Sequence, residues 1–133
     1  MSAYPQPHED AVNAPLLAGW REGRIMLQRC GACGKAIFYP KAMCPHCWSD
    51  KLDWFQASGR GKIVAWSLVH KPHHPAFDGE VPIVLVEVAL DEGVVMLTRI
   101  VGDDRDKAKT GAKVVAVSMP DAAKYPLPTF KLV

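Results

Sequence analysis

Cys30-Gly31-Ala32-Cys33 and Cys44-Pro45-His46-Cys47 are two Cys-x-x-Cys pairs that are separated by ten residues. Each pair can form a tight knuckle in which two thiolates and the nearby backbone amides converge on one ion. Two knuckles together complete a tetrahedral sulfur site, which suits zinc at Zn–S distances of about 2.3 Å. The spacer is short, but it has room for a two-stranded ribbon that includes residues 36–40. Metal binding would also supply folding free energy that so short a segment cannot obtain from its own core.

Other uses of the four cysteines agree less well with the sequence. A redox-active Cys-x-x-Cys pair sits at a strand-to-helix junction in a βαβ context, and the sequence predicts none. Iron fits the same cage of four thiolates, so the ligands alone do not separate it from zinc. A catalytic zinc keeps an open coordination position, which a fourth cysteine would fill. We therefore expect a structural metal ion at Cys30, Cys33, Cys44 and Cys47, with His46 facing solvent.

The composition is that of one globular domain of ordinary size. The chain has 133 residues, of which 49% are hydrophobic and 23% charged, and its net charge is +2. The length excludes a multidomain enzyme, and the hydrophobic content excludes a disordered or collagen-like chain. Nucleic-acid binding usually needs a clear excess of Lys and Arg on one face, and a net charge of +2 gives no sign of it.

The sequence indicates neither export nor membrane insertion. Residues 1–10 contain no basic segment followed by an apolar one, as a secretory signal requires. The longest mostly apolar stretch, residues 81–90, is far shorter than the roughly 20 residues of a membrane-spanning helix. We expect a cytoplasmic protein with reduced cysteines, which disfavours structural disulfides.

An amphipathic helix is predicted before the first cysteine. Within residues 10–24, apolar side chains approximate the spacing of one helix face. They are Val12, Leu16, Leu17 and Trp20. Asn13 before Pro15 suits a helix start, and Gly23 is a typical stop. We interpret residues 1–9 as a mobile arm that precedes this helix.

After the cysteines, β-branched and aromatic residues gather in runs that Gly, Pro and Asp separate. The five runs are residues 61–71, 82–90, 94–101, 113–119 and 130–133. Asp91-Glu92-Gly93 favours an antiparallel hairpin, and residues 102–110 have room for one helical turn. Five strands with such an interruption suit a small closed barrel of the OB type. We therefore predict a mainly β protein: an arm and helix over residues 1–24, a metal-binding ribbon over 25–56 and a five-stranded barrel over 57–133.

The order of these features resembles a known family. The helix that ends in residues 20–24 leads at once into Leu27-Gln28-Arg29-Cys30-Gly31-Ala32-Cys33-Gly34. The likeness continues through Phe38-Tyr39-Pro40, the second cysteine pair, Ser58-Gly59-Arg60-Gly61-Lys62-Ile63 and residues 90–93, and it covers roughly residues 10–119. The chain is similar to rubredoxin-like zinc-ribbon plus OB-fold proteins that are associated with acyl-CoA metabolism as partners of thiolase-like enzymes. Its ending, residues 127–131, departs from the family's Pro-x-Phe-x-Pro pattern.

The resemblance implies a structural zinc ion and an accessory role. Such a subunit docks on a thiolase-fold or related acyl-CoA enzyme and helps to shape the partner's channel, where a CoA ester is contacted through the partner. The resemblance does not imply that this chain carries catalysis. The residues agree, because no Ser-His-Asp, Cys-His or paired-carboxylate arrangement stands out and the cysteines are committed to metal.

Two groups of side chains are candidates for contact with a partner or with CoA. They are Leu16, Leu17 and Trp20 on the helix, and His73, His74 and Phe77 in the segment between the first two barrel strands. The helix face would be exposed if the helix lies outside the barrel, and its packing on the ribbon or barrel is an equal alternative. The second segment is rich in proline, and we interpret it as a surface loop with Phe77 as an apolar anchor.

Binding of single-stranded nucleic acid is the alternative function, because OB barrels and zinc ribbons both serve it. Aromatic side chains on an OB face can stack on bases. We instead assign Trp54, Phe55 and Trp66 to packing, because the first two lead into the barrel and the third lies in the middle of a strand. The two hypotheses predict different partners, an acyl-CoA enzyme in one case and nucleic acid in the other.

Overall fold

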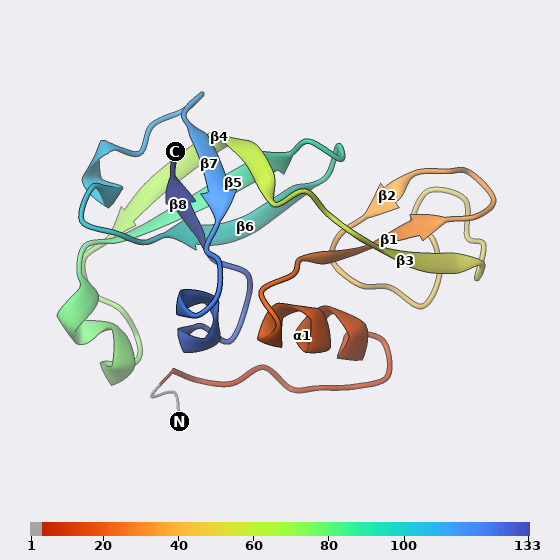
Figure 1. Cartoon of the computed structure of the whole chain (residues 1–133), viewed down its shortest axis with the longest axis horizontal. Coiled ribbons are helices and arrows are strands. Elements are labelled where there is room, and N and C mark those ends of the chain that lie inside the picture. The colour runs from red at the N-terminus through yellow and green to blue at the C-terminus, as the bar shows by residue number, and fades with distance from the viewer. Residues whose placement is uncertain (1–3) are drawn as a thin grey trace.

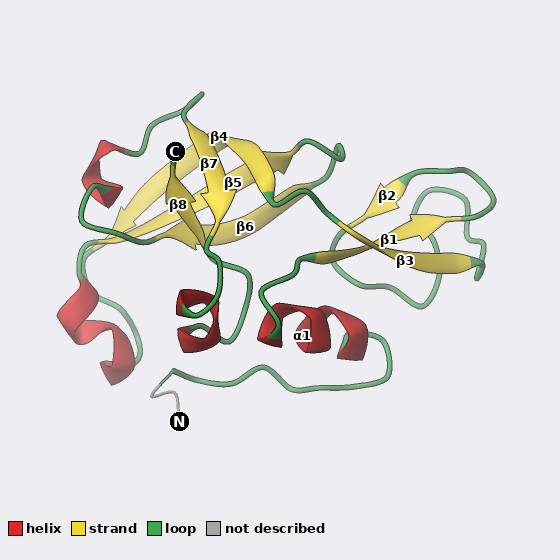
Figure 2. Cartoon of the chain, in the orientation of Figure 1, coloured by secondary structure: helices red, strands yellow, loops and turns green. Residues whose placement is uncertain are grey.

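The computed structural model describes residues 4–133, which form one helix, a small sheet and a barrel (Figures 1 and 2). The helix is α1 (Ala14–Arg21), and the strands are β1 (Met26–Cys30), β2 (Ala36–Ile37), β3 (Leu52–Gln56), β4 (Arg60–Val69), β5 (Ile83–Leu90), β6 (Val95–Ile100), β7 (Lys113–Ala116) and β8 (Phe130–Leu132). Short 3-10 helices are η1 (Pro75–Glu80), η2 (Arg105–Lys107) and η3 (Asp121–Lys124). No helix in the described range has the length and apolar character that crossing a membrane requires.

The barrel strands close in the order β4-β5-β6-β8-β7. Neighbouring strands are antiparallel except β6 and β8, which lie parallel where Ile100 meets Phe130. Every predicted run forms a strand that is somewhat shorter than the run itself, as expected where strands end in turns. The prediction of a mainly β protein with a five-stranded OB barrel is confirmed.

The first barrel strand, β4, depends on a glycine and then bends. A Cβ atom at Gly61 would collide with the carbonyl oxygen of Ala89, so only glycine allows β4 and β5 to approach this closely. The β4–β5 register shifts between Ile63 and Ala65, where β4 has already left β7. Beyond the shift β4 pairs with β5 alone, and Trp66 is 46% exposed. The prediction that Trp66 packs in the core is therefore wrong.

The ribbon has three strands rather than the predicted two. The central strand β1 pairs with β2 on one side and with β3 on the other, both antiparallel. Trp54 and Phe55 belong to β3, opposite Gln28 and Leu27 of β1, so they complete the ribbon and do not yet lead into the barrel. The Arg29 guanidinium lies 4.5 Å from the centre of the Phe55 ring. The third strand arises because residues after the second cysteine pair return to β1.

Helix α1 packs where the ribbon meets the barrel (Figure 1). Leu16 and Leu17 are 4% exposed and Trp20 is 1% exposed. The Trp20 indole N–H donates a hydrogen bond to the carbonyl oxygen of Tyr125 at 3.0 Å. Trp20 also belongs to a continuous core cluster with side chains of β1 and of all five barrel strands. Of the two alternatives for this helix face, an exposed docking face or packing on the ribbon or barrel, the structure shows packing, because the helix covers the apolar junction that the ribbon and barrel leave between them.

Candidate metal centre and apolar groove

The two cysteine pairs form knuckles with the same backbone geometry. The amide of Gly34 donates to the carbonyl oxygen of Cys30 at 2.8 Å, and the amide of Trp48 donates to that of Cys44 at 2.8 Å. In each knuckle, the amide two residues after the first cysteine also points at its sulfur, at 3.3 Å for Cys30 Sγ and 3.4 Å for Cys44 Sγ. N–H groups aimed at sulfur stabilise the thiolate form, which is the form that binds metal.

The four sulfur atoms lie where one ion could contact all of them. All lie within 4.8 Å of one another, with Cys30 Sγ 3.5 Å from Cys47 Sγ and Cys33 Sγ 3.7 Å from Cys44 Sγ. A tetrahedral site with Zn–S distances of about 2.3 Å has sulfur–sulfur separations of about 3.8 Å, so these positions fit zinc. His46 lies outside this group of ligand atoms. Four thiolates would leave the ion no open position for a substrate.

The thiols do not all ionise easily without a cation. The backbone N–H of Cys33, with help from that of Ala32, lowers the pKa of Cys30 to about 6. At Cys47 the backbone N–H of Ser49 lowers the pKa, but the hydrogen bond with Cys30, burial and the other thiols together raise it to about 12. Each further negative charge is added beside one already present. A divalent cation would remove that cost, because metal ions deprotonate the thiols that coordinate them.

The turn after each knuckle has a left-handed backbone conformation. In the first knuckle the residue is Gly34, with φ at +78°, and in the second it is Trp48, with φ at +68°. Trp48 is the one non-glycine residue with positive φ in the described part of the chain, and it is 75% exposed. This conformation costs an L-residue about 1–2 kcal/mol. The ribbon therefore presents an indole to solvent from a backbone position that glycine would occupy at lower cost.

An apolar groove of about 560 Å³ lies on the outer face of β5 and β6. Its floor includes Ile83 and Leu85 of β5 and Leu97 and Arg99 of β6. The walls are the loop after β4, the segment before β8, and the N-terminal arm. The wall residues include Pro72, His73, His74 and Phe77, then Tyr125, Pro126, Leu127, Pro128 and Thr129, and finally Tyr4 and Pro5. β5 and β6 are the second and third strands of the barrel. In OB folds, the face formed by these two strands, with the loop after the first barrel strand and the loop before the last, is the one that binds ligands.

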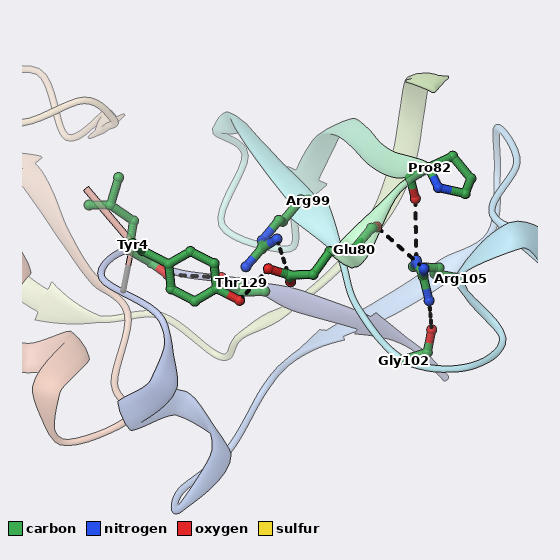
Figure 3. A network of polar contacts seen from close by, with 8 residues as sticks. Tyr4, Glu80, Pro82, Arg99, Gly102, Arg105 and Thr129 are labelled. Atoms are coloured by element: carbon green, nitrogen blue, oxygen red, sulfur yellow. Dashed lines mark hydrogen bonds and ion pairs between the residues drawn. The ribbon is translucent and has the colours of Figure 1, made fainter. Parts of the chain in front are cut away.

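Arg99 is held in the groove by three aromatic rings and one carboxylate. Its guanidinium carbon lies 4.9 Å from the ring centre of Tyr4, 5.3 Å from that of Phe77 and 5.1 Å from that of Tyr125. Arg99 Nη1 pairs with Glu80 Oε1 at 3.1 Å, and the Tyr4 hydroxyl donates to Glu80 Oε2 at 2.7 Å (Figure 3). Burial and the hydrogen bond to Glu80 raise the pKa of Tyr4 above 10.0, so Tyr4 is a neutral donor at pH 7. Arg99 therefore brings no unpaired charge to the groove.

Arg105 fixes the loop that carries Glu80. Its guanidinium donates to the carbonyl oxygens of Glu80 and Pro82 at 3.3 Å each, and to that of Gly102 at 3.1 Å (Figure 3). These bonds join the end of η1 to the turn after β6. The Glu80 carboxylate is consequently presented to Arg99 by a loop that is tied at two points.

The structure brings one predicted group together at the groove and places the other in the core. His73, His74 and Phe77 all line the groove. His74 Nδ1 also accepts a hydrogen bond from the backbone N–H of Ala76 at 3.1 Å, which caps η1. The buried face of α1 does not line the groove.

The sequence reasoning missed Tyr4, Glu80, Arg99 and Tyr125. Tyr4 lies in the segment that we interpreted as mobile, but the structure anchors it on Arg99 and Glu80. Arg99 is a single cation within an apolar strand and carries no motif. A signal was nevertheless present, because residues 4–7 and 125–128 share the pattern Tyr-Pro-x-Pro.

The groove holds no nucleophile with a base in reach. Its lining includes two threonine hydroxyls, and both are engaged by the backbone: Thr98 Oγ1 donates to the carbonyl oxygen of Pro128 at 2.7 Å, and Thr129 Oγ1 donates to that of Leu127 at 2.9 Å. Of the two tyrosines in the lining, Tyr4 donates its hydroxyl to Glu80. Among residues 4–133, the lining includes no Cys, Ser, Lys, Asp or Glu. Covalent acyl transfer needs an activated nucleophile. The groove is therefore suited to binding apolar groups.

Two family models match the chain in succession. Residues 17–53 match the "ChsH2, rubredoxin-like zinc ribbon domain", and residues 54–118 match the "ChsH2, C-terminal OB-fold domain". The chain belongs to the ChsH2 zinc-ribbon and OB-fold family. This confirms the resemblance drawn from the sequence, and it identifies the four-cysteine site as that of a ChsH2-type zinc ribbon.

Relatives of this ChsH2-family chain include proteins of several names. A "Probable enoyl-CoA hydratase alpha subunit" of Thermomonospora curvata is 35% identical over 96% of this chain, which spans only 39% of that relative's length. A "DUF35 domain-containing scaffold protein" of Pyrococcus furiosus is 32% identical over 74% of each chain.

Solved structures show the same fold. A chain of an "Ltp2-ChsH2(DUF35) aldolase" aligns with a TM-score of 0.81 and 34% identity, over 96% of this chain and 98% of that one. A DUF35-family protein of Sulfolobus solfataricus aligns with a TM-score of 0.66 over 92% of this chain and 86% of that one. At 15% identity, the second match supports the fold alone.

Proposed function

We propose that this chain is a zinc-binding, non-catalytic accessory subunit of an acyl-CoA-processing complex. Its partner is a thiolase-fold or related acyl-CoA enzyme, of thiolase-like, aldolase-like or acyltransferase type. The chain helps to form the partner's channel for CoA or the acyl substrate, and it contacts a CoA ester through that partner. The zinc ion is structural and supplies folding free energy to the ribbon when it is bound.

The observation that carries this proposal is the near-complete match to one chain of the Ltp2-ChsH2(DUF35) aldolase. The match covers 96% of this chain and 98% of that one, which supports a role for this chain as one component of such an assembly. The scaffold name of the Pyrococcus furiosus relative supports an assembly role. The hydratase subunit name of the Thermomonospora curvata relative supports an acyl-CoA context.

The chain's own residues support a binding role rather than a catalytic one. Four cysteines suffice to fill the metal's coordination, and the groove lacks a nucleophile with a base in reach. The groove offers an apolar surface, with Phe77 and Leu97 in its lining, to an acyl group or to an apolar part of the partner. His73 and His74 add polar edges to that surface. We therefore assign partner or CoA contact to the groove.

The groove also weighs against the nucleic-acid alternative. In OB folds that bind single strands, bases stack on the outer face of strands two and three, and cations follow the backbone. Here the aromatic rings on that face already surround Arg99, and Glu80 neutralises it. The basic residues Arg60, Lys62 and Lys113 line a separate groove of about 610 Å³ along β4 and β7. We expect single-stranded RNA or DNA to bind no better than the non-specific level of about 10⁻⁴ to 10⁻⁶ M at physiological salt.

Copurification from native cells tests the proposal. The full chain carries a C-terminal tag, and bound proteins are identified and their stoichiometry measured. We expect an acyl-CoA enzyme whose activity or solubility depends on this chain, and no turnover of acyl-CoA esters by the chain alone. Nucleic acid as the stoichiometric partner, or turnover by the isolated chain that a point change outside the cysteines abolishes, would overturn it.

A matched pair of variants tests the role of the groove in that complex. Leu97 and Val95 both lie on β6 with exposed side chains, at 57% and 49%, but only Leu97 lines the groove. Leu97→Asp should weaken the complex, because it places an unpaired charge on the apolar floor. Val95→Asp should leave it intact. Equal effects of the two changes would assign the contact to another surface.

A further inference from the structure

The two ends of the chain carry the same short pattern and meet in the structure. The segments are Tyr4-Pro5-Gln6-Pro7 and Tyr125-Pro126-Leu127-Pro128. Both contribute their tyrosine and first proline to the lining of the groove. The two tyrosine rings are inclined at 28° with centres 6.0 Å apart, and both lie over the Arg99 guanidinium. The groove is thus built around a pair of equivalent tyrosines.

The N-terminal arm reaches this groove through the side chain of Tyr4. The Tyr4 ring stacks on Phe77 with centres 5.2 Å apart, and its hydroxyl donates to Glu80. Within the described part of the chain, residues 5–9 make no backbone hydrogen bond to the barrel. The arm's ion pair, Glu9 with Arg21 at 2.8 Å, is exposed and contributes little. Asn13 Nδ2 also donates to the carbonyl oxygen of His8 at 2.9 Å, but that bond ties the arm to the start of α1 and not to the groove. Among residues 4–9, Tyr4 supplies the aromatic contacts with the groove, and a competing tyrosine could replace it.

The contacts of Tyr4 define what the groove recognises. A ring must fit over Arg99 between Phe77 and Tyr125, and a hydroxyl must reach Glu80. A phenylalanine would remove the hydroxyl that donates to Glu80 Oε2 and leave only the Arg99 bond to Oε1, and an aliphatic side chain would lose the stacking as well. The prolines that follow keep the segment extended at a low entropic cost, which is how aromatic-lined grooves recognise proline-rich segments.

We propose that the part of the groove around Arg99 is a recognition site for extended Tyr-Pro-x-Pro segments, with Tyr4 of the N-terminal arm as its resident occupant, and that a Tyr-Pro-x-Pro segment of a partner protein displaces the arm. The partner is a protein that presents a tyrosine followed by a proline-rich stretch. This site goes beyond the proposed function, which holds whether or not the arm can be displaced. The place over Arg99 would then be closed to the partner until its segment competes with Tyr4, while the rest of the groove stays open.

A peptide titration on the full chain tests the exchange. The probe is the arm itself, an acetylated Tyr-Pro-Gln-Pro-His-Glu-Asp peptide with a fluorescein at its C-terminus, and the readout is fluorescence anisotropy. A tethered arm competes at an effective concentration of about 1 mM. We therefore expect the peptide to bind Tyr4→Ala protein at least about tenfold more tightly than wild type. The same peptide with Ala in place of Tyr should not bind either protein.

Two further variants keep the result interpretable. Glu80→Gln, made in the Tyr4→Ala protein, removes the charged acceptor and should weaken peptide binding about tenfold, while Val95→Asp in the same background should not change it. Tyr4→Phe protein should bind the peptide at a strength between those of wild type and Tyr4→Ala. Circular dichroism on each variant checks the fold.

Three results would overturn the proposal. The first is no binding of the peptide to folded Tyr4→Ala protein up to about 1 mM. The second is equal binding of the Tyr and Ala peptides. The third is a wild-type dimer that Tyr4→Ala dissociates, which would make the occupant the arm of a second copy. None of these results bears on copurification of an acyl-CoA enzyme, so the proposed function is tested separately.

Discussion

Trp20→Ala should remove a buried side chain of α1 that packs against both the ribbon and the barrel. The indole is 1% exposed, and its N–H reaches the carbonyl oxygen of Tyr125, 105 residues away in sequence. Its core cluster includes Ile25 and Leu27 on the ribbon side and Phe130 in the barrel. The substitution therefore leaves a cavity at the junction and an unpaired acceptor beside it.

The magnitude follows from these two losses. Replacing a buried tryptophan by alanine costs about 3–5 kcal/mol, and an orphaned buried carbonyl adds about 1 kcal/mol or more. A domain of this size is stable by about 5–15 kcal/mol in total, so the loss would be roughly half of a typical free energy of unfolding. A loss of about 4 kcal/mol would lower Tm by roughly 14 °C, or lower the urea midpoint by roughly 2–3 M. Trp20→Phe, which keeps an aromatic ring, should lose about half as much.

Urea unfolding of the zinc-loaded protein measures the loss, with circular dichroism as the probe. Trp66→Ala is the matched control, because it deletes the same side chain at a position that is 46% exposed, and it should cost less than about 1 kcal/mol. Hydrogen exchange on Trp20→Ala should show weakened protection in both β1 and the barrel strands, since the core is continuous. A loss below about 1 kcal/mol for Trp20→Ala, or equal losses for the two tryptophans, would refute this account of the junction.

Three other predictions concern the ribbon and the arm. Chelation of the metal, or Cys44→Ser, should abolish hydrogen-exchange protection in residues 30–52 while much of the barrel stays protected. The reason is that the small cluster of Cys30, Ile37, Cys44 and Leu52 cannot hold the ribbon tip alone. Equal loss of protection in the barrel would contradict this prediction. Trp48→Gly should raise the free energy of unfolding by about 1 kcal/mol in urea melts, since it relieves a left-handed backbone, and a loss of stability would show that the indole packs. The pKa of Tyr4 is raised in the folded protein. Docking of the arm is therefore fully present below pH 10 and is lost as the pH rises through the folded-state pKa of Tyr4, because a phenolate would face Glu80. Ultraviolet titration of wild type against Tyr4→Phe measures this pKa.

The metal site and the barrel could be predicted because each depends on local patterns. Two Cys-x-x-Cys pairs fix four ligands whatever the rest of the chain does, and the run from residue 82 to 90 has the length and composition of a strand in any context. The end of β4 could not be predicted in the same way. Trp66 has the residue type of a core position, but its exposure depends on where β4 parts from β7, which is a matter of tertiary pairing.

The groove could not be read from the sequence because it is assembled from segments that are far apart. Tyr4, Glu80, Arg99 and Tyr125 come from the arm, η1, β6 and the segment before β8. None of them is unusual alone, since a lone Arg in a strand or a Tyr beside a Pro is common. These residues are recognised as one site because they lie together in the structure, and only the repeated Tyr-Pro-x-Pro pattern indicated this in the sequence.

The position of Trp20 relates the metal ribbon to the groove. Helix α1 follows the arm that carries Tyr4 and leads directly into β1, which ends at the metal ligand Cys30. The same helix holds Tyr125 through the Trp20 indole, and the ring of Tyr125 lies over Arg99 in the groove. The ribbon, through Ile25 and Leu27, and the groove, through Tyr125, are therefore both connected to one buried side chain. The buried indole of Trp20 thereby holds the metal ribbon and the groove at a constant separation, more rigidly than a linker would.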